Sequence, residues 1–216
     1  MRKKGRGMAG LIGTVHLDPA GEARLRAALG TWRPRAVTVD VSPYAIEFRL
    51  RRGEELRGRL DPFRRPDGSL PPGLEAVAAQ LQVPYEWTAA AAYAAETGIA
   101  AEPVGDSAAS REWLELLEKE LLAPANLACL AREEVPILSE QVAWEYATAR
   151  RHWREGKATG SAGREGLRAA DALVAALLAD RPDRKGLVHV TGWEHLAGLA
   201  AALELPPARC TLLCDF

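Results

Sequence analysis

Two histidines in this chain have the setting best suited to chemistry, and each completes the same short phrase. His16 ends Gly13-Thr14-Val15-His16, and His195 ends Gly192-Trp193-Glu194-His195. Both phrases follow an apolar run typical of a buried strand and precede a predicted helix. An imidazole at the end of a strand can act as a general acid or base, or it can bind a metal ion.

The Gly-x-x-His spacing alone is weak evidence, because His189 also follows a glycine, Gly186, by three positions. His189 falls inside a predicted strand, where we expect a buried ring whose nitrogens have hydrogen-bond partners. His152 falls on a basic helical stretch and is expected at the surface. The position between strand and helix, rather than the spacing, therefore distinguishes His16 and His195.

Asp40 is the third candidate, and the order of the elements places it near His16. The segments 8–15 and 36–41 read as strands, and a helix that begins at Asp18-Pro19 and ends at Gly30 separates them. Such a βαβ unit predicts two parallel strands. Ligands bind at the carboxyl edge of open α/β sheets. We therefore expect His16 and Asp40 on the same rim of a sheet.

The rest of the chain predicts an α/β fold with a central, mostly parallel or mixed sheet, flanking helices and a helical insertion between its early and late strands. Further strands are expected at 99–104, 186–191 and 211–214. Asp106 follows the first of these, and we favour it as a helix cap over a site residue. Residues 8–216 are expected to form a single domain with the insertion at about 70–180, and residues 1–7 to form a flexible basic arm.

Composition and charge exclude several classes of protein. The chain has 216 residues and a net charge of -1, so no overall field attracts nucleic acid or a membrane. No apolar run approaches the ~20 residues of a membrane span, and the basic start lacks the features of a signal peptide. Three cysteines provide no disulfide framework. We expect a soluble, cytoplasmic protein with no membrane partner.

Seven arginines between residues 49 and 65 form the strongest local charge. The first interpretation is a solvated face, and the alternative is a patch for an anionic ligand or nucleic acid. Phe63, near its end, is the only aromatic residue in the run, which makes nucleic acid the less favoured partner. In the predicted insertion, Trp144, Tyr146 and Trp153 could make a homodimer contact.

The phrase at residues 13–16, the helix after it and the run 32–41 resemble the opening of the TraB/PrgY proteins. Residues 192–199, Gly-Trp-Glu-His-Leu-Ala-Gly-Leu, resemble the closing phrase of that family. The resemblance covers roughly residues 9–48 and 186–200. TraB proteins are similar to the Tiki proteases, the ChaN-like haem-binding lipoproteins and the erythromycin esterases, which share two Gly-x-x-His motifs and an acidic residue after the second strand.

This resemblance implies a site made of His16, Asp40 and His195, to which Arg164 is added from the Arg-acid pair of the family. The chain departs from the family pattern twice. Position 40 holds Asp in place of Glu, and position 194 holds Glu in place of Gly. Glu194 could enter the site or cap the following helix. Either departure could alter metal binding or mark a member that has lost activity.

Two kinds of hydrolysis follow from the resemblance. Similarity to the Tiki proteases implies a peptidase in which His16, Asp40 and His195 hold Mn, Co or Zn. Similarity to the erythromycin esterases implies a metal-free reaction, with one histidine as base beside Asp40 and the other as oxyanion partner. In either reaction Arg164 could bind a substrate carboxylate or the oxyanion. The expected substrate is a small molecule or a peptide.

The alternative function is a non-catalytic binding or regulatory protein on the same scaffold. Resemblance to TraB implies regulation of a peptide pheromone, and resemblance to ChaN implies haem binding. The distance between His16 and His195 tests whether they share a site. If the two rings lie more than ~12 Å apart, they cannot hold one metal ion or water molecule between them.

Overall fold

A parallel sheet forms the centre of the computed structural model, which describes residue 8 and residues 10–155, 164–182 and 184–216, with side chains undescribed at 164–169. Its strands are β1 (Gly10–Thr14), β2 (Ala36–Val39), β3 (Ala100–Pro103), β4 (Leu187–Gly192) and β5 (Cys210–Leu212). In this part of the chain they form one sheet in the order β3-β2-β4-β1-β5, and every pairing is parallel. The predicted α/β class is confirmed.

The two central strands are buried along their whole length. Every residue of β1 and of β4 is buried, as expected for strands covered on both faces. β4 lies between β1 and β2, so these two strands are parallel, as predicted, without being neighbours. The two Gly-x-x-His phrases therefore come from adjacent strands in the middle of the sheet.

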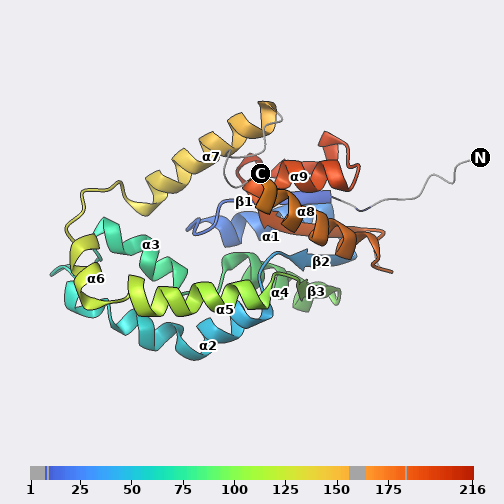
Figure 1. The fold of residues 1–216 in the computed structure, drawn as a ribbon. Coiled ribbons are helices and arrows are strands. Elements are labelled where there is room, and N and C mark those ends of the chain that lie inside the picture. Colours follow the sequence, from blue (N-terminus) through green and yellow to red (C-terminus); the bar gives the residue numbers. More distant parts are fainter. Residues whose placement is uncertain (1–7, 9, 156–163, 183) are drawn as a thin grey trace, which may run out of the picture.

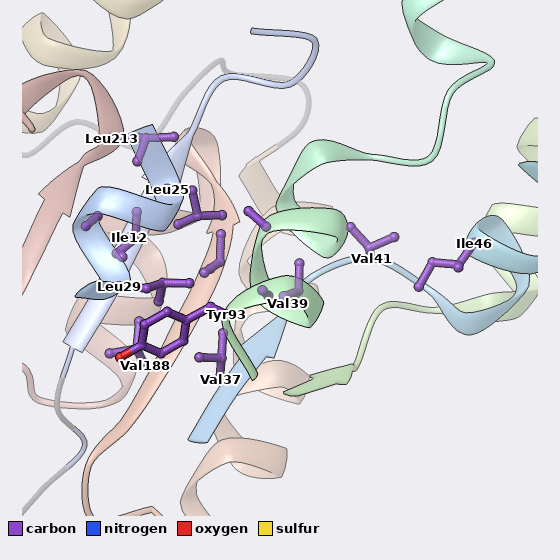
Figure 2. Close-up of a cluster of buried hydrophobic side chains, with 14 of the residues drawn as sticks. Ile12, Leu25, Leu29, Val37, Val39, Val41, Ile46, Tyr93, Val188 and Leu213 are labelled. Carbon is purple, nitrogen blue, oxygen red and sulfur yellow. The ribbon is translucent and has the colours of Figure 1, made fainter. Parts of the chain in front are cut away.

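Helices cover both faces of the sheet. Helices α1 (Gly21–Trp32) and α4 (Tyr85–Thr97) pack on one face, where Ile12, Val37 and Val188 meet Leu25 and Leu29. Figure 2 shows this cluster, with Tyr93 of α4 closing it. Helices α8 (Arg164–Ala179) and α9 (Trp193–Ala202) cover the other face.

The remaining helices lie beside the sheet, most of them in a second helical cluster. Helices α2 (Pro43–Gly58), α3 (Pro72–Gln80), α5 (Ser107–Leu116) and α6 (Pro124–Leu130) gather on one side of the molecule in Figure 1, and α7 (Leu138–Glu155) runs from them to α9. A π-helical turn, Leu117–Leu121, extends α5. Short 3-10 turns lie at Asp61–Phe63, Pro207–Arg209 and Leu213–Asp215. The region between β2 and β4 is thus mainly helical and contains β3.

Side chains cap the first turns of α2 and α5. Ser42 accepts a hydrogen bond from the Ala45 amide at 3.0 Å, and Asp106 accepts from the Ala108 amide at 2.7 Å, so the cap predicted at Asp106 is confirmed. Two details were wrong. Helix α1 continues through Gly30 to Trp32, and it begins at Gly21 after Ala20, which has no side-chain cap hydrogen bond; Asp18 accepts from the Ala20 amide at 2.9 Å instead.

Among the residues described here, none of the helices combines the length and apolar character required to cross a membrane. The basic segment at 1–7 lies outside the described residues.

Candidate active site

His16 lies just beyond the carboxyl end of β1 and is paired with a buried carboxylate. Its Nδ1 donates to Oε1 of Glu86 at 2.7 Å, and Glu86 is contributed by the first turn of α4. The His16 side chain is 55 % exposed, whereas that of Glu86 is 3 % exposed. Oγ1 of Thr14 lies 3.1 Å from the same carboxylate oxygen. The pair fixes the ring and leaves Nε2 of His16 for chemistry.

This pair determines the charge of His16. Burial on its own lowers the pKa of His16, but the hydrogen bond and the charge of Glu86, together with the charges of Glu194 and Glu145, outweigh it and raise the pKa to about 9. His16 is therefore an imidazolium at neutral pH. Such a cation can stabilise a developing oxyanion or protonate a leaving group.

His195 forms a second pair of the same kind. It lies in the first turn of α9, and its Nδ1 donates to Oδ1 of Asp171 on α8 at 2.7 Å. The Asp171 bond raises the pKa of His195, burial acts against it, and the charges of Asp40 and Glu194 add to the increase. Both histidines therefore use Nδ1 to hold a carboxylate and present the opposite edge of the ring.

The two pairs meet at Gly192, the last residue of β4. A Cβ atom on Gly192 would stand 3.1 Å from Nε2 of His16, 3.1 Å from Oε2 of Glu194 and 3.7 Å from Cδ2 of His195. The backbone of Gly192 has φ -56°, which any residue can adopt. A side chain at this position would crowd the site, because three candidate site residues surround the position of the missing atom. The two rings are thus far closer than the ~12 Å that would exclude a shared water or metal.

Asp40 sits one residue beyond β2 on the same edge. Its Oδ2 accepts a hydrogen bond from Oγ1 of Thr191 at 3.1 Å, and its charge acts on both His195 and His189. His189 is buried beneath the site, with Nδ1 3.0 Å from Oγ1 of Thr38. Its Nε2 has no hydrogen-bond partner among the described residues, so the expectation of a fully satisfied ring was wrong. Burial lowers the pKa of His189 to about 4, and the ring is neutral.

The loop that carries His16 is held by a separate network. Leu17 has a left-handed backbone with φ 66°, an uncommon conformation for this residue type. Asp18 follows it and binds Arg24 at 2.7 Å and the Tyr146 hydroxyl at 3.1 Å. The Tyr85 hydroxyl donates to the Val15 carbonyl at 2.9 Å. These contacts from α1, α4 and α7 hold His16 in a turn that the backbone alone disfavours.

A large cavity opens beside the site, between the carboxyl edge of the sheet and the second helical cluster. Its volume is about 1270 Å³, and His16, Asp40 and Glu86 contribute to its lining. Gly192, Glu194 and His195 are not part of that lining. His16 therefore connects the cavity with the three-residue junction at Gly192. A cavity of this size accommodates a small molecule or a short peptide segment.

The structure thus brings four of the five predicted site residues to one edge of the sheet: His16, Asp40, Glu194 and His195. Glu194 faces the site and is not a helix cap. Arg164 begins α8, but its side chain lies outside the described residues.

One feature of the predicted ligands His16, Asp40 and His195 is consistent with a bound metal ion. Both histidines carry a carboxylate on Nδ1, as metal-bound histidines commonly do. However, the described residues contain no group of three His, Cys, Asp or Glu side chains positioned to hold a metal ion. The high pKa of His16 would also require the metal to displace a proton. Metal binding therefore stays a prediction.

Sequence reasoning missed Glu86 and Asp171, although each carries a recognisable signal. Glu86 is the only charged residue from Tyr85 to Ala95, and Asp171 is the only one from Ala169 to Ala179. Both segments are rich in alanine and form helices that pack on the sheet. A single carboxylate in such a segment is expensive to bury unless it has a partner, and a histidine across the fold is a suitable one.

No family model, no curated protein and no solved structure matches the chain. The resemblance to the TraB/PrgY proteins therefore stays a prediction, and the chemistry must be argued from the site itself.

Proposed function

We propose that this chain is a hydrolase of ester or amide bonds in a small molecule or peptide, with its reaction centred above Gly192. One observation carries the proposal. Two histidine-carboxylate pairs and the Glu194 carboxylate converge on a glycine at the carboxyl edge of a parallel sheet, beside a large cavity. Histidine-carboxylate pairs with a purely structural role would not need the space that the missing Cβ of Gly192 leaves beside both rings.

The charges of the groups suggest their roles. With its raised pKa, His16 is an acid at neutral pH and is suited to bind the carbonyl oxygen. The raised pKa of His195 likewise leaves less of its ring unprotonated at that pH, so less of it is available to accept a proton. Glu194, whose Oε2 approaches the same point as Nε2 of His16, is a carboxylate that can accept a proton from water.

In the proposed reaction, Glu194 takes one proton from a water molecule as its oxygen bonds to the carbonyl carbon. The negative charge that develops on the carbonyl oxygen is stabilised by the imidazolium of His16 and the edge of His195. The bond to the leaving oxygen or nitrogen then breaks, and His16 gives it a proton. Transfer of the proton from Glu194 to His16 restores both groups. The sum is one water consumed and one acid and one alcohol or amine released.

The sequence also predicted two groups that the proposed reaction does not require, Arg164 and a divalent metal ion. Arg164 remains a candidate for binding the oxyanion or a substrate carboxylate. A divalent metal, if bound at His16, Asp40 and His195, would polarise the carbonyl and activate water. No step of the reaction above depends on either.

The test is a panel of activated esters and chromogenic peptide amides, assayed with and without Mn, Co or Zn. Wild type should hydrolyse at least one class. His16→Ala and His195→Ala should each lower kcat/KM by about 100-fold or more. A metal-dependent reaction would show activity only after metal addition. If both variants keep the wild-type rate, the proposed hydrolytic centre is wrong; binding of ligand without turnover would favour the regulatory alternative.

A further inference from the structure

Two arginines on α2, Arg49 and Arg57, line the same cavity as the His16-Glu86 pair. They belong to the arginine run of residues 49–65, most of which the structure accounts for by surface pairing. Arg51 pairs with Glu47, Arg52 and Arg59 with Glu55 and Glu118, and Arg64 with Asp61. Arg49 and Arg57 have no carboxylate partner among the described residues.

Arg49 is held in place by groups that leave its charge uncompensated. Its Nε donates to the Gln80 carbonyl at 2.8 Å and its Nη1 to the Ala45 carbonyl at 3.1 Å. The guanidinium also lies 6.0 Å from the centre of the Trp113 ring. Burial lowers the pKa of Arg49 to about 10, and the charge of Glu86 acts against this shift. Arg49 therefore remains a cation within electrostatic range of the catalytic pair.

Arg57 lies two helical turns further along α2. It is half-buried, and its side chain makes no hydrogen bond or ion pair with any residue that the structure describes. A half-buried cation without a partner is costly, because it loses hydration without gaining an attractive contact. A ligand anion would supply that contact, and guanidinium groups bind planar carboxylates and phosphates through paired hydrogen bonds.

Each acidic residue that lines the cavity already accepts a hydrogen bond, and Glu75 accepts one from the Leu138 amide. Asp18 binds Arg24 and Tyr146, Asp106 caps α5, Glu22 accepts from Thr88, and Asp40 accepts from Thr191. Glu86 holds His16. Among the arginines that line the cavity, Arg64 pairs with Asp61, so the two without a carboxylate partner among the described residues both lie on α2, on a different element from the reaction centre.

We propose that Arg49 and Arg57 form an anion-binding subsite, so that the substrate carries a carboxylate or phosphate group that is bound by α2 while its ester or amide reaches His16. The substrate role of this anion rests on the proposed hydrolysis, but the subsite itself does not. It also gives the arginine run a function that does not involve nucleic acid.

Binding is tested by isothermal titration with benzoate, phenyl phosphate and the neutral benzyl alcohol, in a buffer free of phosphate and low in chloride. Wild type should bind at least one anion, and the alcohol should bind at least about tenfold more weakly. Preference for benzoate would indicate a carboxylate substrate, and preference for phenyl phosphate a phosphorylated one. Equal binding of the alcohol would overturn the proposal.

Variants separate the subsite from the reaction and from folding. Arg49→Met and Arg57→Met should each weaken anion binding about tenfold. Arg51→Met, on the exposed face of the same helix, is the matched control and should bind as wild type does. Arg49→Met also loses two bonds to the backbone, so Arg57→Met serves as the variant that leaves the fold intact. Wild-type affinity in both would contradict the subsite.

The two proposals can fail independently. His16→Ala should lose hydrolysis but keep anion binding, because Arg49 and Arg57 are untouched. Anion binding without hydrolysis in wild type would refute the reaction alone. Hydrolysis of neutral and anionic esters with equal kcat/KM, combined with no anion binding, would refute the subsite alone.

Discussion

At the scale of single residues, the site depends on the missing side chain of Gly192 as much as on the functional groups of His16, Glu194 and His195 around it. Nε2 of His16 and Oε2 of Glu194 approach the place of the absent Cβ to 3.1 Å each. The sequence identified His16 and His195 through their setting between strand and helix. It could not show that the glycine of the second phrase leaves room for both rings, because that depends on the neighbouring strand.

Gly192→Ala tests this role directly. The backbone accepts alanine, so the free energy of unfolding should change by less than about 1 kcal/mol. The added methyl group would occupy the space between His16 and Glu194, and kcat/KM should fall about 100-fold, since small displacements of reacting groups have effects of that order. Enzyme kinetics and urea denaturation measure the two quantities.

Gly30→Ala is the matched control for this substitution. Gly30 lies within α1, and nothing stands within 4 Å of the position of its Cβ. Alanine should raise helix stability by about 0.5–1 kcal/mol without changing kcat/KM. Full activity in Gly192→Ala would show that the space above β4 is not used in the reaction.

At the scale of elements, the second pair depends on how closely α8 and α9 approach. Asp171 of α8 reaches His195 by occupying the space beside Gly198 on α9, where a Cβ would overlap its carboxylate. This contact explains why position 198 is occupied by glycine: a larger residue would overlap the Asp171 carboxylate. Sequence patterns predicted both helices, but their relative rotation is set by packing on the sheet, so the partner of His195 could not be predicted.

Gly198→Ala should therefore displace Asp171 and destabilise the protein by about 1–3 kcal/mol through overpacking. The pKa of His195, followed by NMR, should fall because its main partner is lost. Adding Asp171→Ala to Gly198→Ala should recover part of the stability, while activity stays low. A single variant as stable as wild type, with an unchanged His195 titration, would contradict this arrangement of α8 and α9.

At the scale of the whole molecule, the site collects groups from β1, β2, α4, α8 and α9 at one edge of the sheet. The alternation of strands and helices was enough to predict the α/β class and the edge that carries His16 and Asp40. It was not enough to predict that β4 inserts between β1 and β2, because strand order depends on long-range pairing. The partner Glu86 was missed for the same reason: the helical insertion was predicted, but not the position of its helix α4 against β1.

The His16-Glu86 pair should make the stability of the whole fold depend on pH. The folded pKa of His16, about 9, is above the ordinary value of 6.5. The pair therefore stabilises the fold fully below pH 6.5 and loses this contribution as the pH rises through 9. Urea denaturation from pH 6 to 10 should show the loss, and NMR should give the His16 titration directly.

Glu86→Gln is the comparison that isolates this pair from the similar contribution of His195. The amide removes the charge that holds His16 protonated, so the pKa of His16 should fall towards 6.5 and the loss of stability between pH 6.5 and 9 should become smaller. A pH profile identical to that of wild type would show that Glu86 does not control the charge of His16.

The register of the central sheet also determines when in folding the site can form. Gly10 pairs with Val188, and Leu11 pairs with Cys210, so β1 is completed only by strands from the far end of the sequence. Pairings of such long range close large loops and are typical of slow folding. A nascent chain would carry His16 and Glu86 long before β4 and α9 leave the ribosome. The proposed site should therefore form late and together with the final collapse of the sheet, rather than step by step during synthesis.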